Sequence, residues 1–225
     1  MRAVLRFHMN RPLLALLLTL TLASAGCSVA VGQDGQVDAR IGSAEPFTWD
    51  PAQAGDAGTA SVLAQVYEGL TAFDSDSVVQ PALASSWQAD EDGRRLTFTL
   101  RPDLRYSDGA PITAQHVVDS WLRLIDPARP SPLASLLTDI EGAAGYMAGT
   151  VGPEGVGLRA EGDRVVIDLR RPATYFLSVT ASPSLGVVAP STVGQLGSGP
   201  PAVVSGAYVP SIAGEGIIGL TGNQS

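Results

Sequence analysis

The chain has 225 residues, and 45% of them are hydrophobic, a share large enough to build a packed core and therefore to exclude a wholly disordered protein. The formal net charge is −8, and all 14 basic residues are arginines. Proteins that bind nucleic acid normally concentrate basic residues on one face, and no such cluster occurs in this sequence. The composition therefore argues for a folded protein without a nucleic-acid partner.

Residues 1–26 have the order of parts of a secretory signal peptide. Three arginines precede an aliphatic run at 13–22, and four small residues follow that run. The run is too short for a transmembrane helix, which needs about 20 apolar residues. The sequence therefore predicts export and removal of this segment.

Cys27 is the only cysteine, so no intramolecular disulfide is possible. An idle thiol or an intermolecular bridge is one interpretation. The other starts from Ser24-Ala25-Gly26-Cys27, which resembles the lipobox of bacterial lipoproteins, whose cysteine carries a diacylglycerol. Lipidation of Cys27 is predicted to hold the exported domain at the cell membrane, facing the outside or the periplasm. Residues 27–43 are small, polar and rich in glycine, which is typical of a tether.

A helix is predicted at 59–70, where apolar residues recur at helical spacing and Gly69 stands at the expected end. A hairpin is predicted at 87–101. Its second half alternates Leu, Phe and Leu with polar residues, and an acidic turn ending in Gly93 precedes it.

Three further elements are predicted towards the C-terminus. A second hairpin at 157–169 turns at Gly162-Asp163, a short helix at 173–181 begins after Pro172, and short strands are expected around 202–209. Because strands and helices alternate along the chain, the predicted fold class is α/β.

The segment at 106–126 contains Ser107, Asp108, His116 and Asp119, and this grouping raises the possibility of a hydrolytic site. Two observations favour a turn followed by a helix. Asp-Gly-Ala-Pro at 108–111 has turn composition, and a single apolar stripe follows a threonine suited to cap a helix. The chain also lacks the G-x-S-x-G setting of many serine nucleophiles. A hydrolase using Ser107 and His116 remains the minor alternative.

No metal or cofactor site is predicted. After removal of the signal segment the chain keeps one histidine and one cysteine, too few for a His/Cys metal cluster. The acidic groups at 74–76 and 90–92 have the composition of turns. The glycine-rich stretch at 152–157 lacks the Lys-Ser/Thr pair of a phosphate-binding loop.

The motif Y-S-D-G-x-P-[IV]-T-A, followed by a helix carrying S-W-x-R-L-x-D-P, resembles the extracellular solute-binding proteins of family 5, the oligopeptide- and dipeptide-binding receptors of ABC importers. Seven further stretches resemble that family in the same order. They are EPFTWDP at 45–51, YEGL at 67–70, PALASSW at 81–87, LTFTLR at 96–101, SPLASLL at 131–137, RRPATYFL at 170–177 and SGAY at 205–208. The aromatic and leucine side chains of these motifs are predicted to be core, namely Trp87, Leu96, Phe98, Trp121 and Leu124.

The resemblance implies a type II periplasmic-binding-protein fold with a mixed sheet, in which two lobes close on a ligand. Family members are much longer than this chain. It is expected to contain the first lobe (44–75 and 155–225) and an inserted subdomain (76–154), with the second lobe missing. The implied function is non-enzymatic: a monomeric lipoprotein that binds peptides and delivers them to a membrane permease, weakly or not at all in this short form.

In peptide-binding relatives, an extended ligand pairs with backbone edges like an added strand. The matching residues here are Ala54, Gly55, Asp56 and Ala57, with Leu133, Ser205 and Gly206 also expected to face the ligand. Peptide binders can carry an aromatic residue where this chain has Leu133, which leaves a receptor for a non-peptide solute, such as a metal chelate or haem, as an alternative. His116 replaces an acid that completes a capping box in the family, and a cost in helix stability is expected.

Overall fold

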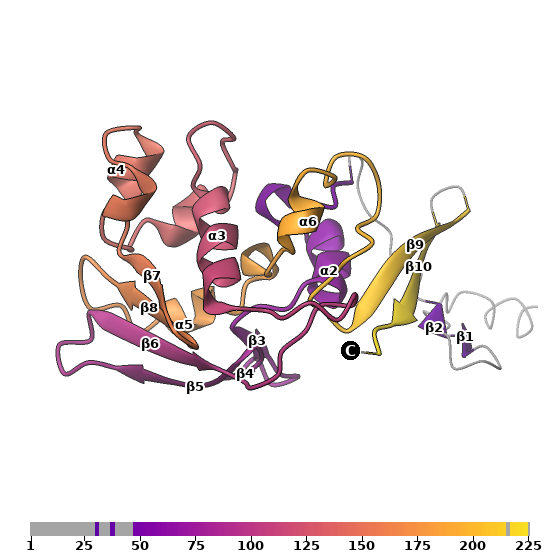
Figure 1. Ribbon diagram of the computed structural model, residues 1–225, viewed down its shortest axis with the longest axis horizontal. Helices are drawn as coiled ribbons and strands as arrows, with labels where there is room; N and C mark the ends of the chain where they lie inside the picture. The colour runs from indigo at the N-terminus through magenta and orange to yellow at the C-terminus, as the bar shows by residue number, and fades with distance from the viewer. Residues whose placement is uncertain (1–29, 32–36, 39–46, 215–216, 225) are drawn as a thin grey trace, which may run out of the picture.

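The computed structural model describes residues 30–31, 37–38, 47–214 and 217–224. In this part of the chain, helices alternate with three sheets, in agreement with the predicted α/β class (Figure 1). The predicted mixed sheet is not found among these residues. Every strand pair described is antiparallel, since most neighbouring strands are joined by a hairpin.

One four-stranded sheet has the order β5-β6-β8-β7 and places the two predicted hairpins side by side. Its strands are β5 (Ala84–Ala89), β6 (Arg95–Leu100), β7 (Leu158–Glu161) and β8 (Arg164–Asp168). Gly93 and Gly162 lie in the two turns with φ of 64° and 66°, a region that glycine enters without strain. Both hairpin predictions are confirmed. The pairing of β6 with β8, which joins the hairpins, has no signal in the local sequence.

Helix α3 (Ala114–Leu124) packs against β7 and β8, and its start and end agree with the prediction. Thr113 caps its first turn, and its buried stripe faces the sheet. The Trp121 Nε1–H donates to the Leu185 carbonyl at 3.1 Å, which fixes the orientation of the indole. Of the predicted core residues, Leu96, Phe98, Trp121 and Leu124 are buried, and Trp87 is partly buried.

Helix α2 (Ala57–Val66) is displaced towards the N-terminus relative to the predicted 59–70. Asp56 caps it, and the chain leaves helical geometry at Tyr67. Gly69 therefore does not end the helix. A Cβ at this position would lie 3.3 Å from the carbonyl oxygens of Thr71 and Thr180, so Gly69 lies at a close backbone approach.

The C-terminal hairpin consists of β9 (Tyr208–Gly214) and β10 (Ile217–Gly222). The strand prediction at 202–209 is wrong for 202–207, and β10 has no predicted counterpart. β2 (Val37–Asp38) pairs with β10 and with β1 (Ala30–Val31), so the described part of the predicted tether joins this sheet. The rest of the predicted tether lies outside the described residues.

The remaining elements are short. They are η1 (Pro51–Gln53), β3 (Thr71–Phe73), β4 (Val79–Pro81), η2 (Ala134–Leu137), α4 (Ala143–Met147), η3 (Pro153–Gly155), α5 (Phe176–Val179), η4 (Pro183–Leu185) and α6 (Pro190–Val193). The helix predicted at 173–181 is thus reduced to the four residues of α5.

Within the described ranges, buried residues form two clusters. The larger cluster lies between the β5-β6-β8-β7 sheet and α3, and the smaller one joins α2 to β10 through Val62, Leu63, Val66, Val204 and Leu220. The β7–β8 hairpin belongs to the larger cluster together with β5 and β6. The observed sheet therefore spans the domain boundary predicted between residues 154 and 155.

Candidate ligand-binding site

The predicted ligand-binding residues 54–57 connect η1 to α2. Ala54 is buried, whereas Gly55 and Ala57 are exposed. The Asp56 carboxylate accepts the amide of Thr59 at 2.9 Å, and hydrogen bonds from Thr59 hold the pKa of Asp56 below its usual value. This side chain is therefore engaged in capping the helix.

The backbone around Gly55 is extended and accessible. Ala54 and Asp56 both have β-region dihedrals, and a Cβ built on Gly55 would meet no atom within 4 Å. Among the described residues, neither the amide nor the carbonyl of Gly55 has a backbone hydrogen-bond partner. An exposed extended segment with free backbone groups is the geometry to which an extended ligand adds as a strand.

The SPLASLL segment lies beside this connection. The Ser131 hydroxyl donates to the Ala52 carbonyl, and the Gln53 side-chain amide donates to the Pro130 carbonyl at 3.4 Å. Leu133 precedes η2 and is half-buried against the larger core. The structure thus brings residues 52–53 and 130–131 together, although 77 and 79 residues separate the bonded partners along the chain.

Ser205 and Gly206 lie at the opposite end of α2. The Ser205 hydroxyl donates to the Val187 carbonyl at 2.6 Å and accepts the Glu68 amide at 3.0 Å. The Gly206 amide donates to the Val66 carbonyl at 2.9 Å. A helix of ten residues is about 15 Å long, so about this distance along α2 separates these two residues from Ala54–Ala57.

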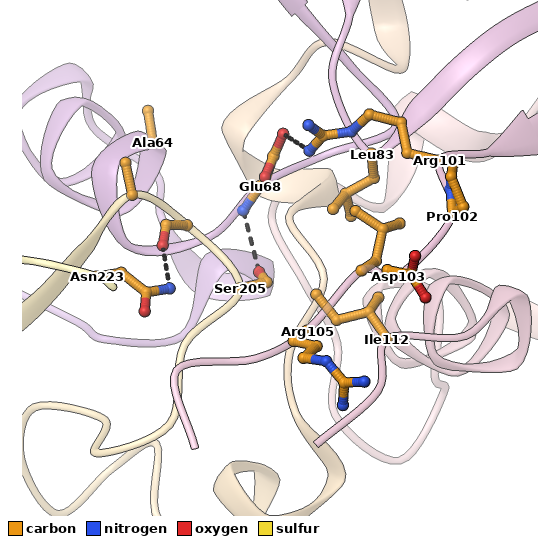
Figure 2. Close-up of a pocket in the computed structure, with 13 residues that line it drawn as sticks. Ala64, Glu68, Leu83, Arg101, Pro102, Asp103, Arg105, Ile112, Ser205 and Asn223 are labelled. Carbon is orange, nitrogen blue, oxygen red and sulfur yellow. Dashed lines mark hydrogen bonds and ion pairs between the residues drawn. The ribbon is translucent and has the colours of Figure 1, made fainter. Parts of the chain in front are cut away.

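A cavity of about 590 Å³ adjoins Ser205 and Gly206 (Figure 2). Its walls carry the charged side chains of Glu68, Arg101, Asp103 and Arg105 over an apolar floor that includes Leu83. A site with both signs of charge beside apolar surface suits a small amphipathic solute. None of these charged residues was assigned a role from the sequence, although Glu68 and Arg101 lie within the YEGL and LTFTLR motifs.

Glu68 and Arg101 form an ion pair in the wall of this cavity, with Nη2 and Oε1 3.1 Å apart (Figure 2). Burial raises the pKa of Glu68, and the nearby Arg101 guanidinium partly opposes that rise. The pair joins the end of α2 to the end of β6. The sequence shows only that the two motifs carry opposite charges. That Glu68 and Arg101 meet is decided by the fold, because 33 residues separate them.

Ser107 and His116 are not brought together as a catalytic pair. Ser107 Oγ accepts the amide of Val204 at 3.1 Å and donates to the Ala202 carbonyl at 3.4 Å. His116 Nδ1 accepts the Thr113 amide at 3.4 Å, while Asp119 accepts a hydrogen bond from Gln115. Ser107 therefore holds the loop that leads into Ser205.

His116 completes the capping box of α3. The expectation that histidine in place of an acid leaves this box incomplete is therefore wrong. The imidazole accepts the Thr113 amide only when Nδ1 is unprotonated. Burial lowers the pKa of His116, although Asp119 opposes this.

Because its folded pKa is depressed, the stabilising effect of His116 is present above its ordinary pKa of about 6.5 and is lost as the pH falls through the folded value. We expect the wild-type chain to lose stability relative to His116→Gln between pH 7.5 and pH 5, measured by urea unfolding. Glutamine keeps an acceptor that does not titrate. Equal losses in both proteins would contradict this role.

Ser107→Ala is expected to lower the free energy of unfolding by about 1–3 kcal/mol, because the amide of the fully buried Val204 loses its partner. Urea unfolding measures this change. Ser85→Ala is the matched control, since its exposed hydroxyl bonds only the Thr99 carbonyl. An unchanged stability in Ser107→Ala would show that the hydroxyl does not hold the loop.

Cys27 lies outside the described residues, so its predicted lipidation stays a prediction. Within the described ranges, no helix is long and apolar enough to cross a bilayer. The same ranges contain no group of three His, Cys, Asp or Glu side chains placed to hold a metal ion.

Comparison with known proteins identifies relatives of this chain. The profile of "Bacterial extracellular solute-binding proteins, family 5 Middle" matches residues 78–211, more than half of the sequence. The chain is 32% identical over 197 residues to the periplasmic oligopeptide-binding protein OppA of Haemophilus influenzae, covering 84% of this chain and 36% of OppA. It is 35% identical over 144 residues to the probable deoxycholate-binding periplasmic protein YgiS of Escherichia coli, covering 63% of this chain and 27% of YgiS.

Solved structures agree with these matches. The H. influenzae OppA complex with the peptide RPPGFSPFR has a TM-score of 0.73 and 33% identity, covering 80% of this chain and 37% of that one. The murein tripeptide binding protein MppA of E. coli has a TM-score of 0.73 at 30% identity, covering 80% and 36%. The chain thus spans about a third of the length of the relatives it matches.

Proposed function

Because the chain belongs to family 5 of the bacterial extracellular solute-binding proteins, we propose that it binds peptides outside the membrane and delivers them to the permease of an ABC importer. The observation that carries the choice of ligand is the exposed, extended backbone at Gly55, whose amide and carbonyl have no backbone partner among the described residues. Backbone pairing recognises a peptide without selecting its side chains. The complex of the OppA relative with a peptide supports this reading.

The proposed architecture is a type II binding fold in which this chain supplies the first lobe and an inserted subdomain. Residues 44–75 and 155–225 were assigned to the lobe and 76–154 to the insertion. Because β7–β8 pairs with β6 and packs in the larger core, we propose a later second boundary, near residue 187. The greater length of the relatives supports a second lobe that closes over the ligand.

Within this scheme, Gly55 and its neighbours Ala54, Asp56 and Ala57 contact the ligand backbone, and Leu133 lies beside them. Ser205 and Gly206 border the separate cavity at the other end of α2. A lipid on Cys27 would anchor the monomeric protein to the cell membrane. The partners are then a peptide, the permease and the membrane.

Calorimetric titration with short peptides tests the role of Gly55. The isolated chain is expected to bind weakly, with a dissociation constant no tighter than micromolar, because it spans about a third of its relatives. Gly55→Pro should weaken binding at least about tenfold, since proline removes the amide hydrogen that pairs with the ligand. Gly55→Ala keeps that amide and is the matched control. Equal affinity in both variants would contradict backbone pairing, and sub-micromolar binding would contradict the need for further chain.

A non-peptide solute is the second candidate. The observation that favours it is the match to YgiS, which is named a probable deoxycholate-binding periplasmic protein. Leu133, where peptide binders can carry an aromatic residue, is consistent with this candidate. Native mass spectrometry of the purified protein distinguishes the two: co-purified peptides support the first function, and a retained amphipathic non-peptide molecule supports the second.

A further inference from the structure

Asp50 and Arg123 form a partly buried ion pair between segments far apart in the sequence. Arg123 Nη1 lies 2.7 Å from Asp50 Oδ2, and the two side chains are only 12% and 15% exposed. Arg123 lies in the last turn of α3, and Asp50 precedes η1. The pair therefore joins α3, which packs on the β5-β6-β8-β7 sheet, to the start of η1. The chain runs from η1 through Ala54–Asp56 into α2.

Asp50 also organises the backbone of η1. Its second carboxylate oxygen accepts the Ala52 amide at 2.9 Å, and its own carbonyl accepts the Gln53 amide at 2.9 Å. The Tyr67 hydroxyl donates to the neighbouring Trp49 carbonyl at 3.2 Å. Together with the bond from Ser131 to Ala52, these contacts fix residues 49–53. They come from three places: the end of α2, α3 and the segment before η2. Gly55, two residues further on, is free of such contacts.

The pair is poorly suited to adding stability. Within the described residues, Arg123 Nε is buried without a hydrogen-bond partner, so the guanidinium is not held at both ends. Desolvating two charges offsets much of their attraction, and apolar replacement of a buried pair is often neutral for stability. Such a pair does fix the orientation of the backbone segments on which its two residues lie.

We infer that Asp50 and Arg123 are positioning residues that fix η1 and thereby hold Ala54–Ala57 in the extended geometry that receives the ligand. This inference rests on the proposed function, since it assigns a purpose to the geometry of that segment. The pair lies in the WDP and S-W-x-R-L motifs and acts on Ala54–Ala57 through the backbone of η1. Removing either charge leaves the other uncompensated, whereas removing both does not.

Four proteins test the inference: wild type, Asp50→Asn, Arg123→Met and the double variant. Asparagine keeps the acceptor for the Ala52 amide. Urea unfolding is expected to show destabilised single variants and a double variant close to wild type. Amide hydrogen exchange at Ala52 and Gln53 is expected to rise at least about tenfold in all three variants. The reason is that each variant loses the charge-assisted hydrogen bond from Arg123 to residue 50, which holds η1 in place. Arg95→Met, which breaks an exposed ion pair on the sheet, is the control and should leave these amides unchanged.

Exchange and ligand binding separate the two proposals. Unchanged exchange in the double variant would overturn the positioning role, whatever the chain binds. Faster exchange in the double variant, together with equal peptide affinity of Gly55→Pro and Gly55→Ala, would support positioning and contradict the proposed backbone pairing at Gly55. Where the wild type does bind peptide, the double variant should bind at least about tenfold more weakly at near-normal stability, and equal affinity would overturn the inference.

Discussion

Replacing Trp121 with alanine is expected to lower the free energy of unfolding by about 3–5 kcal/mol. The indole is fully buried between α3 and the sheet, so its removal leaves a cavity that the surrounding strands cannot fill. The Leu185 carbonyl also loses its donor, which adds the cost of an unpaired buried acceptor. Urea unfolding followed by circular dichroism measures the change.

Two further variants identify the cause. Trp121→Phe keeps most of the volume and removes the Nε1–H, so it separates the hydrogen bond from packing. Trp87→Ala removes the same kind of side chain from a partly buried position in β5 of the sheet against which α3 packs, and should cost clearly less. Equal losses at positions 121 and 87 would show that burial on α3 is not the cause.

Gly206→Ala is expected to destabilise the chain by about 1–3 kcal/mol or more. A Cβ there would lie 2.6 Å from the Gln65 carbonyl oxygen and 2.8 Å from the Tyr67 amide nitrogen. These are backbone atoms at the end of α2, and they cannot rotate away as a flexible side chain would. The loop must therefore move off the helix, which also weakens the contact between Ser205 and Glu68.

The thermal unfolding temperature of the variant provides the measurement. Gly194→Ala is the matched control, because its added Cβ meets nothing within 4 Å and its backbone is already in the right-handed helical region. A variant as stable as this control would contradict the close packing of Gly206 on α2. The result would also bear on function, since Gly206 was predicted from the sequence to face the ligand.

The sequence predicted correctly those helices and hairpins whose signals lie within a few neighbouring residues. α3 begins at Thr113 because the cap and the apolar stripe lie within a dozen residues, and the two hairpins turn at Gly93 and Gly162 for the same reason. The β9–β10 hairpin was largely missed, because its glycine-rich sequence lacks a clear alternation of apolar and polar residues. At the site, the exposed extended backbone at Gly55 agrees with the expected ligand-binding stretch, whose role stays a prediction.

The sequence by itself determined the family, through motifs in a shared order, and the elements whose signals are local. Only the tertiary structure decided that β6 pairs with β8, that Ser107 holds the loop at Val204, and that Glu68 and Arg101 pair in the wall of a cavity. The reason is physical: caps, turns and periodicity depend on residues a few positions apart. Contacts between distant segments depend instead on how whole faces pack, and no single segment encodes that arrangement.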